Sequence, residues 1–362
     1  MDNRLEEARK IINKVDAQMA ELFVERMRAA ELVYAYKKEY GLPILDAKRE
    51  NVVIERNASA IEDEVLRGYY IDFLRDVMAV SRAYQYRMQS GLKVAYSGVE
   101  GAFAHIAAGR IFPEANRIPY RDFALAYDAV VRGESDFAVL PIENSYAGEV
   151  GQTIDLLFTG TLYVNGIYEL KICQNLLGVP GATVADIRRV TSHPQALSQC
   201  HDYIALHGFT TEEASNTAIA AKTVAESGDK TLGAIASVET AELYGLQVLD
   251  TNIHKSAENT TRFAVLSKVR ANTPAYTNSV LMFSVKNEAG TLANAIGIIG
   301  KYGYNMTALR SRPLKDHSWQ YYFYIELDGS TDTDYGRQMM RELGAVCDKL
   351  KLAGTFAPHT EI

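Results

Sequence analysis

The chain has 362 residues, enough for two or three domains. Hydrophobic residues make up 48% and charged residues 23% of it, an ordinary globular mixture, and the formal net charge of −7 argues against a general role on nucleic acids or membrane surfaces. The three cysteines lack metal-ligand spacing, the N-terminal stretch MDNRLEEARK does not read as a signal peptide, and no apolar run is long enough to span a membrane, so we expect a soluble cytoplasmic protein.

Residues 1–90 predict three helices, over about 3–38, 46–58 and 62–89, with a turn at Gly41-Leu42-Pro43. In the first helix, apolar residues recur at helical spacing: Leu5, Ala8, Ile11, Ile12, Val15, Met19, Leu22 and Phe23. A helix of ~36 residues is ~54 Å long and cannot pack wholly on two shorter partners. We therefore expect a helical dimer.

These helices also carry polar residues that packing does not require. Arg26 and Lys37 are about three turns apart and share a face, whereas Arg9 points about 100° away from Arg26 and serves a different site or a partner subunit's site. Solvated ion pairs are the alternative explanation for any single residue. As a set in this order, the residues resemble the site of the all-helical chorismate mutases: Arg9, Arg26, Lys37, Asp46, Arg49, Glu50, Ser81 and Gln85.

The chemistry of that family accounts for the residue types. Chorismate is a dianion that rearranges through a pericyclic transition state, so its enzyme must hold one conformer and stabilise separating charge, without a nucleophile. The resemblance implies a role for each residue: carboxylate binding by Arg26 and Arg49, with Arg9 from the other subunit and Ser81 in support; donation to the ether oxygen by Lys37 and Gln85; and orientation of the ring hydroxyl by Asp46 and Glu50.

From Gly91 the hydrophobic pattern changes to short apolar strands with helical stretches between them. We expect strands at 92–98, 137–143, 187–193, 231–237 and 262–268, and the alternation predicts an α/β fold with a mostly parallel sheet. Phe263–Leu266 reads as a buried strand of such a sheet, with Thr260, Thr261 and Arg262 at its entrance. Ligand sites in α/β folds gather at strand ends.

Four motifs accompany these strands: GVEGAF at 98–103, ENS at 143–145, SHPQALSQ at 192–199 and TRF at 261–263. The first lacks the spacing of a dinucleotide fingerprint, and Asn-Ser after a strand is also an ordinary helix cap. Together the motifs resemble the catalytic domain of prephenate dehydratases over 93–270, which implies two α/β lobes around a cleft, as in a small periplasmic binding protein.

The resemblance also implies roles in losing the ring carboxylate and hydroxyl of prephenate. Thr261 would hydrogen-bond the leaving oxygen or relay a proton, and Arg262 would hold a carboxylate. Glu143 is a candidate proton source if burial raises its pKa. The remaining residues would orient the substrate: Asn144, Ser192 and Gln199.

A third unit starts after Thr273-Pro274, with strands at 277–286, 305–314, 318–328 and 351–356 and helices at 290–302 and 333–349. This split βαββαβ order predicts an α+β ferredoxin-like domain and resembles the ACT domains of phenylalanine-sensitive dehydratases. Its candidate effector-binding residues are Gly290, Thr291, Leu292, Ser311 and Arg312. The family's Glu-Ser-Arg-Pro motif reads Arg310-Ser311-Arg312-Pro313 here, a change that can remove or re-aim a polar contact. A module used only for dimerisation is the alternative.

We therefore expect a mutase domain (1–90), a dehydratase domain (91–271) and an ACT domain (272–362) in one bifunctional enzyme. It would convert chorismate to prephenate and then to phenylpyruvate, with phenylalanine as effector, as a homodimer or higher oligomer. Neither step requires a metal or an organic cofactor. The alternatives are a small-molecule sensor with inactive catalytic domains, and a dehydratase that uses arogenate, the aminated analogue of prephenate.

Overall fold

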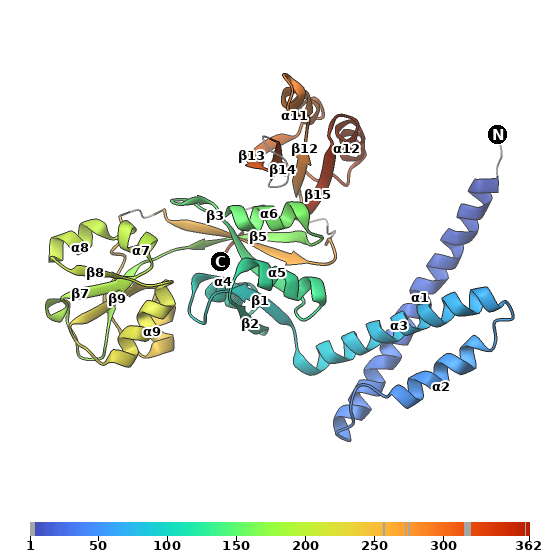
Figure 1. The fold of residues 1–362 in the computed structure, drawn as a ribbon, viewed down its shortest axis with the longest axis horizontal. Coiled ribbons are helices and arrows are strands. Elements are labelled where there is room, and N and C mark those ends of the chain that lie inside the picture. The colour runs from blue at the N-terminus through green and yellow to red at the C-terminus, as the bar shows by residue number, and fades with distance from the viewer. Residues whose placement is uncertain (1–3, 256–257, 272, 274–275, 315–319, 359) are drawn as a thin grey trace. The chain divides into compact units, whose positions relative to one another are not determined.

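The computed structural model describes residues 4–255, 258–271, 273, 276–314, 320–358 and 360–362, in two compact units, Met1–Leu92 and Lys93–Ile362 (Figure 1). The predicted domain start at Thr273-Pro274 lies partly outside the described residues. No helix in the described ranges has the length and apolar character needed to cross a membrane.

The first unit consists of α1 (Arg4–Glu39), α2 (Ala47–Ala58) and α3 (Glu64–Ser90), which confirms the three predicted helices. Asp46 and Asp63 cap the second and third helices with their side chains. Both α1 and α2 pack on α3. The apolar stripe of α1 stays largely uncovered within this chain: Ile11 is 65% exposed and Leu22 is 63% exposed.

The second unit contains two α/β lobes. The first lobe is a sheet in the order β5-β11-β3-β1-β2, from strands Tyr163–Lys171, Thr260–Ser267, Phe137–Asn144, Lys93–Ser97 and Asn116–Tyr120. The short strands β4 (Gly148–Glu149) and β16 (Thr360–Glu361) pair with β3 and β5, respectively. Its helices are α4 (Phe103–Ile111), α5 (Phe123–Arg132) and α6 (Gly151–Thr159).

The second lobe is a five-stranded sheet in the order β10-β6-β9-β7-β8, from strands Gln247–Asp250, Asn175–Gly178, Leu232–Ala236, Arg189–Ser192 and Thr210–Glu213. Its helices are α7 (Pro194–Gln199), α8 (His201–His207), α9 (Thr217–Ser227) and α10 (Val238–Tyr244), with a 3₁₀ turn at Val184–Asp186. The chain enters this lobe between β5 and β6 and returns between β10 and β11. Two crossings of this kind are consistent with the predicted two-lobed fold.

The prediction that β11 belongs to a parallel sheet is wrong. This strand runs antiparallel to both β3 and β5. Its apolar run correctly indicated burial, but burial on both faces does not depend on strand direction. Strand β11 arrives from the other lobe without a crossover helix of its own sheet, so no βαβ unit forces it to be parallel. It also begins two residues earlier than predicted, so Thr260 and Thr261 lie inside the strand.

The C-terminal elements are β12 (Asn278–Ser284), α11 (Thr291–Lys301), β13 (Asn305–Pro313), β14 (Tyr321–Asp328), α12 (Asp334–Val346) and β15 (Lys349–Phe356). They have the predicted βαββαβ order and form an antiparallel sheet, β13-β14-β12-β15. Part of the predicted strand 318–328 lies outside the described residues. The predicted helix 333–349 ran three residues too far at its C-terminal end, because the chain is already extended at Cys347.

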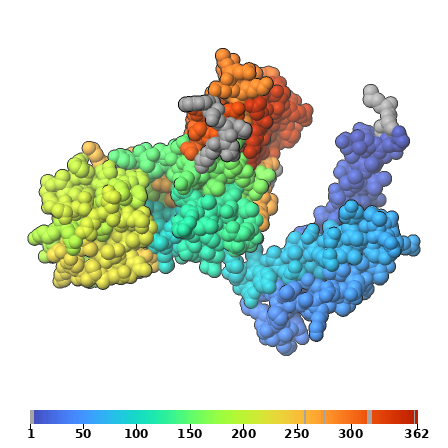
Figure 2. Space-filling view, in the orientation of Figure 1, coloured from blue at the N-terminus to red at the C-terminus, as the bar shows by residue number. Residues whose placement is uncertain are grey.

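The C-terminal sheet continues into the first lobe, a connection the sequence did not reveal. Strand β15 pairs with β5 at Gly354 and Val164, so the two sheets join. A β-carbon at position 354 would overlap the Val164 backbone, and only glycine allows this approach. In Figure 2 the orange and red surface of the C-terminal elements lies directly against the green surface of the first lobe.

Candidate active sites

In the helical unit, the predicted residues Arg26 and Ser81 meet between α1 and α3, and Gln85 follows one turn along α3. The half-buried Arg26 guanidinium donates to the Ser81 hydroxyl and to the Val77 carbonyl oxygen. Burial lowers the pKa of Arg26, and the Glu50 carboxylate opposes that change. Gln85 is only 6% exposed, and its Oε1 has no hydrogen-bond donor among the residues that the structure describes. A buried amide oxygen without a hydrogen-bond donor destabilises the fold unless a ligand or water supplies that donor.

The other predicted residues of this unit do not join the contact between Arg26 and Ser81. The Lys37 ammonium donates to the Ile44 carbonyl oxygen at 2.5 Å. The Asp46 carboxylate caps α2 by accepting from the Arg49 backbone amide, and both side chains are exposed. Arg9 is exposed on α1.

Glu50 has a partner that the sequence did not reveal. Its carboxylate forms an ion pair with Arg82 of α3 at 2.5 Å. Arg82 stands next to Ser81 in the S-x-x-x-Q motif, and that adjacency was the available signal.

In the second unit, Thr261 lies in two adjoining cavities between the lobes, of about 250 and 620 Å³. The smaller is lined by Asn144 and Gln199 as well as Thr261, and also by Ala102 and Phe103, so all four predicted motifs converge there. The N-terminal ends of α4 and α9 border both cavities, through the cap residue Ala102 and Phe103 of α4 and the cap residue Asn216 of α9. Their backbone N–H groups place partial positive charge at the cleft.

A chain of side-chain amides connects the lobes at this point. The Asn144 Nδ2 donates to Thr261 Oγ1 and to Asn259 Oδ1, both at 2.9 Å. Asn259 in turn donates to Gln199 Oε1 at 3.1 Å, and Gln195 donates to Asn144 Oδ1 at 3.3 Å. Because Thr261 accepts from Asn144, its own proton is free to donate elsewhere.

Sequence reasoning missed Asn259 and Gln195. Gln195 stands inside the SHPQALSQ motif and Asn259 stands two residues before the TRF motif, and that proximity was the available signal.

Ser192 and His193 have local roles in the structure. The Ser192 hydroxyl is fully buried and donates to the Ile235 carbonyl oxygen at 2.6 Å. His193 caps α7, accepting from the Gln195 backbone amide through Nδ1, and its ring borders the smaller cavity.

The structure does not bring Glu143 and Arg262 to this cleft. Successive side chains of a strand point to opposite faces, so Arg262 points away from Thr261 and borders another cavity, of about 270 Å³, with Glu326 of β14. Its guanidinium bonds Glu326 at 2.8 and 3.0 Å and Glu143 at 3.2 Å.

The condition attached to Glu143 as a proton source is not met. Burial alone would raise the pKa of Glu143, but Arg310 and Arg262 outweigh it and hold that pKa below its ordinary value. Burial alone would lower the pKa of Arg262, but the Glu326 carboxylate raises it above its ordinary value. The two groups therefore stay ionised as partners.

The candidate effector residues lie in the C-terminal elements. Gly290 has φ +86° and immediately precedes α11, and the Thr291 hydroxyl donates to the Lys286 and Glu288 carbonyl oxygens. Leu292 packs on the core of these elements. On β13, Ser311 is exposed.

The neighbouring Arg312 points to the opposite face of β13. Its guanidinium bonds Asp155 and Glu149 of the first lobe at 2.7 and 2.8 Å. This predicted effector residue therefore already has carboxylate partners within the chain.

Comparison with known proteins accounts for both units. The profile of the prephenate dehydratase family matches residues 94–271, and that of chorismate mutase type II matches residues 8–86. The bifunctional chorismate mutase/prephenate dehydratase of Neisseria gonorrhoeae is 30% identical over 363 residues, 98% of each chain. Arogenate dehydratase/prephenate dehydratase 2 of Arabidopsis thaliana is 32% identical over 282 residues, 75% of this chain and 74% of that one. The solved prephenate dehydratase of Arthrobacter aurescens in complex with L-Phe has a TM-score of 0.68 at 26% identity and covers 74% of this chain and 90% of that one.

Proposed function

This chain belongs to the family of bifunctional chorismate mutase/prephenate dehydratases, and we propose how its residues divide the two reactions. It is an enzyme of phenylalanine biosynthesis. The helical unit rearranges chorismate to prephenate, and the second unit dehydrates and decarboxylates prephenate to phenylpyruvate. The sensor alternative is set aside, because relatives with both activities match along the whole chain.

In the mutase site, Arg26 binds a substrate carboxylate, since its half-buried guanidinium already faces the Ser81 hydroxyl. The buried Gln85 amide donates to the ether oxygen through Nε2. Its Oε1, which has no donor among the described residues, accepts a hydrogen bond from the substrate or from water. Lys37 releases the Ile44 carbonyl and donates to the ether oxygen, where negative charge develops. Glu50 is held by Arg82 and orients the ring hydroxyl.

We propose that the mutase site is completed in a homodimer built on α1. The support is the uncovered apolar stripe of that helix, with Leu5 61% exposed in addition to Ile11 and Leu22. Arg9 lies on the same helix and would enter the partner's site. We also propose a cytoplasmic location.

In the dehydratase site, the substrate carboxylates bind at the N-terminal ends of α4 and α9 rather than at Arg262, which is occupied by glutamates on the other face of the sheet. The Thr261 proton, directed away from Asn144, hydrogen-bonds the departing C4 hydroxyl. As the bond to the ring carboxylate breaks, its electron pair enters the ring and carbon dioxide leaves, and the C4 hydroxyl leaves as water after accepting a proton that Thr261 relays from solvent. Aromatisation drives the reaction.

Phenylalanine is proposed to bind the C-terminal elements at Gly290–Leu292. The relative solved with L-Phe supports an amino-acid site in this family. Titration calorimetry with phenylalanine should show binding that Gly290→Trp abolishes, because no side chain fits easily at φ +86°. Binding that survives the substitution would place the effector elsewhere.

The convergence of Thr261, Asn144 and Gln199 in one cleft carries the proposal for the second reaction. The test gives the purified chain chorismate alone and follows phenylpyruvate by its enolate absorbance in base. Phenylpyruvate should appear. Accumulation of prephenate would instead favour arogenate as the second substrate, which the similarity to arogenate dehydratases makes the candidate to try next. Unchanged chorismate would contradict the proposal.

A further inference from the structure

Two arginines of β13 reach from the C-terminal elements to the first lobe. Arg310 and Arg312 stand two residues apart, so they share the inner face of the strand. Arg310 contacts Glu143 at the end of β3, and Arg312 contacts Glu149 in β4 and Asp155 in α6. Both therefore bind the segment 143–155, which begins beside the dehydratase cleft.

Arg310 belongs to an arginine–glutamate cluster formed with Arg262, Glu143, Glu169 and Glu326. Its Nη2 lies 2.5 Å from Glu143 and its Nη1 lies 3.6 Å from Glu326. The cluster is partly buried: the Arg310 and Glu326 side chains are 15% and 3% exposed, whereas those of Glu143 and Glu169 are 28% and 33% exposed. Arg310 also lies over the Tyr324 ring, 5.3 Å from its centre.

Two members of the cluster are the immediate chain neighbours of the cleft residues Asn144 and Thr261. Glu143 precedes Asn144 on β3, Arg262 follows Thr261 on β11, and the two strands are paired so that Glu143 faces Arg262 and Asn144 faces Thr261. Any movement of Glu143 therefore moves the backbone of Asn144, and with it the hydrogen bond to Thr261. Through this connection the C-terminal elements affect the positions of Asn144 and Thr261 at the dehydratase cleft.

Charge explains why two arginines are needed. Glu143, Glu169 and Glu326 bring three negative charges to a partly buried volume, and Arg262 alone supplies one positive charge. With Arg310 absent, Glu143 and Glu326 share one guanidinium and repel each other, which separates the end of β3 from β14.

We propose that Arg310 is a positioning residue for the dehydratase reaction, holding Glu143 so that Asn144 and Thr261 stay in register at the cleft. The proposal rests on the dehydratase function assigned above. Arg310 does not touch the substrate in this account. Arg312 reinforces it by fixing the next part of the same segment.

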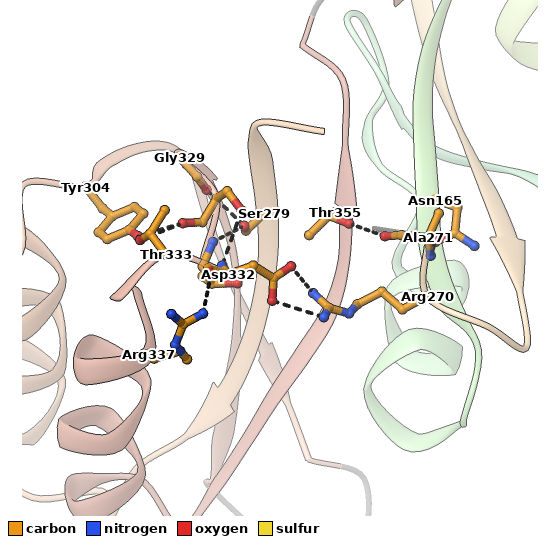
Figure 3. Close-up of polar contacts among 12 residues, drawn as sticks. Asn165, Arg270, Ala271, Ser279, Tyr304, Gly329, Asp332, Thr333, Arg337 and Thr355 are labelled. Carbon is orange, nitrogen blue, oxygen red and sulfur yellow. Dashed lines mark hydrogen bonds and ion pairs between the residues drawn. The ribbon is translucent and has the colours of Figure 1, made fainter. Parts of the chain in front are cut away.

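Other contacts keep the C-terminal elements attached when Arg310 is removed, so its effect can be measured locally. Figure 3 shows one such contact: Arg270, just after β11, forms a two-pronged ion pair with Asp332 at 2.8 and 3.1 Å. In the same view, the Thr355 hydroxyl donates to the Ala271 carbonyl oxygen at 2.8 Å. The pairing of β15 with β5 is a third contact.

The test compares Arg310→Met and Arg310→Lys with a control, Lys301→Met, whose exposed ion pair with Glu342 lies wholly within the C-terminal elements. Initial rates with prephenate and with chorismate are measured on the full chain. For Arg310→Met we expect kcat for prephenate to fall about 10- to 100-fold while KM changes by less than about twofold. Arg310→Lys should recover part of the loss, because a point charge still faces Glu143. Mutase activity should match the control.

Hydrogen exchange of the peptide covering 143–155 supplies a readout that is independent of activity. It should be faster in Arg310→Met than in Lys301→Met. Unchanged exchange together with an unchanged kcat would overturn the proposal, and so would an equal loss of both activities, which indicates general unfolding. Should the unmodified chain fail to use prephenate, the proposed function fails, and the exchange measurement still decides whether Arg310 holds this segment.

Discussion

Replacing Asn259 with alanine tests whether the amide chain across the cleft serves the reaction. Asn259 is 2% exposed and bonds both Asn144 and Gln199. Each buried hydrogen bond contributes about 1–2 kcal/mol when its partner is left unsatisfied. The substitution should therefore lower the free energy of unfolding by about 2–4 kcal/mol, which lowers Tm by roughly 5–15 °C.

Stability alone does not establish a role in the reaction, so the assay needs a matched control. Asn165 is also a buried asparagine, and it bonds Ser267 and the Val269 and Ala271 backbone away from the cleft. Asn165→Ala should cost a similar free energy of unfolding and leave the dehydratase kcat within about twofold, whereas Asn259→Ala should lower that kcat about 10- to 100-fold because Asn144 is released. Equal kcat values for the two variants would refute the reasoning.

Three further predictions concern single residues. Lys37→Ala should abolish mutase activity and spare dehydratase activity, and Thr261→Ala should do the reverse; steady-state rates with each substrate check this, and loss of both activities in either variant would contradict separate sites. Gln85→Leu should leave the helical unit at least as stable, since it removes a buried oxygen without a partner, yet lower mutase kcat by about tenfold or more; a clear fall in Tm would show that the amide is satisfied. Arg310 and Arg262 together outweigh burial and lower the pKa of Glu143 from 4.5, so its ionised form adds stability that is complete above the unfolded pKa and disappears as pH falls through the folded one; urea unfolding should show Glu143→Gln less stable than the unmodified chain at pH 7, with a gap that narrows below about pH 4.5, and a gap independent of pH would exclude this origin.

Much of the fold could be predicted because its signals are local. The three helices of the first unit follow from apolar spacing and from the turn at Gly41-Leu42-Pro43. The βαββαβ order of the C-terminal elements follows in the same way from the change between the two hydrophobic periods. Strand direction did not follow, because the apolar run of β11 reads identically whichever way its neighbours run.

The candidate site was partly predictable for a similar reason. The position of the motifs at the ends of predicted strands correctly indicated that Thr261, Asn144 and Gln199 meet at a cleft. The expectation that Arg262 joins them came from the family resemblance of the TRF motif, with Thr261 and Arg262 both placed at the entrance of the strand. Once Thr261 is inside β11, the two side chains must point to opposite faces.

Local patterns were enough to predict the three helices of the first unit, the βαββαβ order of the C-terminal elements and the residue types at the cleft, since each depends on neighbours within a few positions. Three contacts emerge only in the folded chain: Arg310 meets Glu143, Asn259 joins Asn144 to Gln199, and β15 extends the sheet of the first lobe at Gly354. The two residues of each of these pairs are separated by at least 60 positions in the chain. Which distant groups become neighbours depends on how the sheets close and on which charges must be neutralised once water is excluded, and no local pattern encodes that.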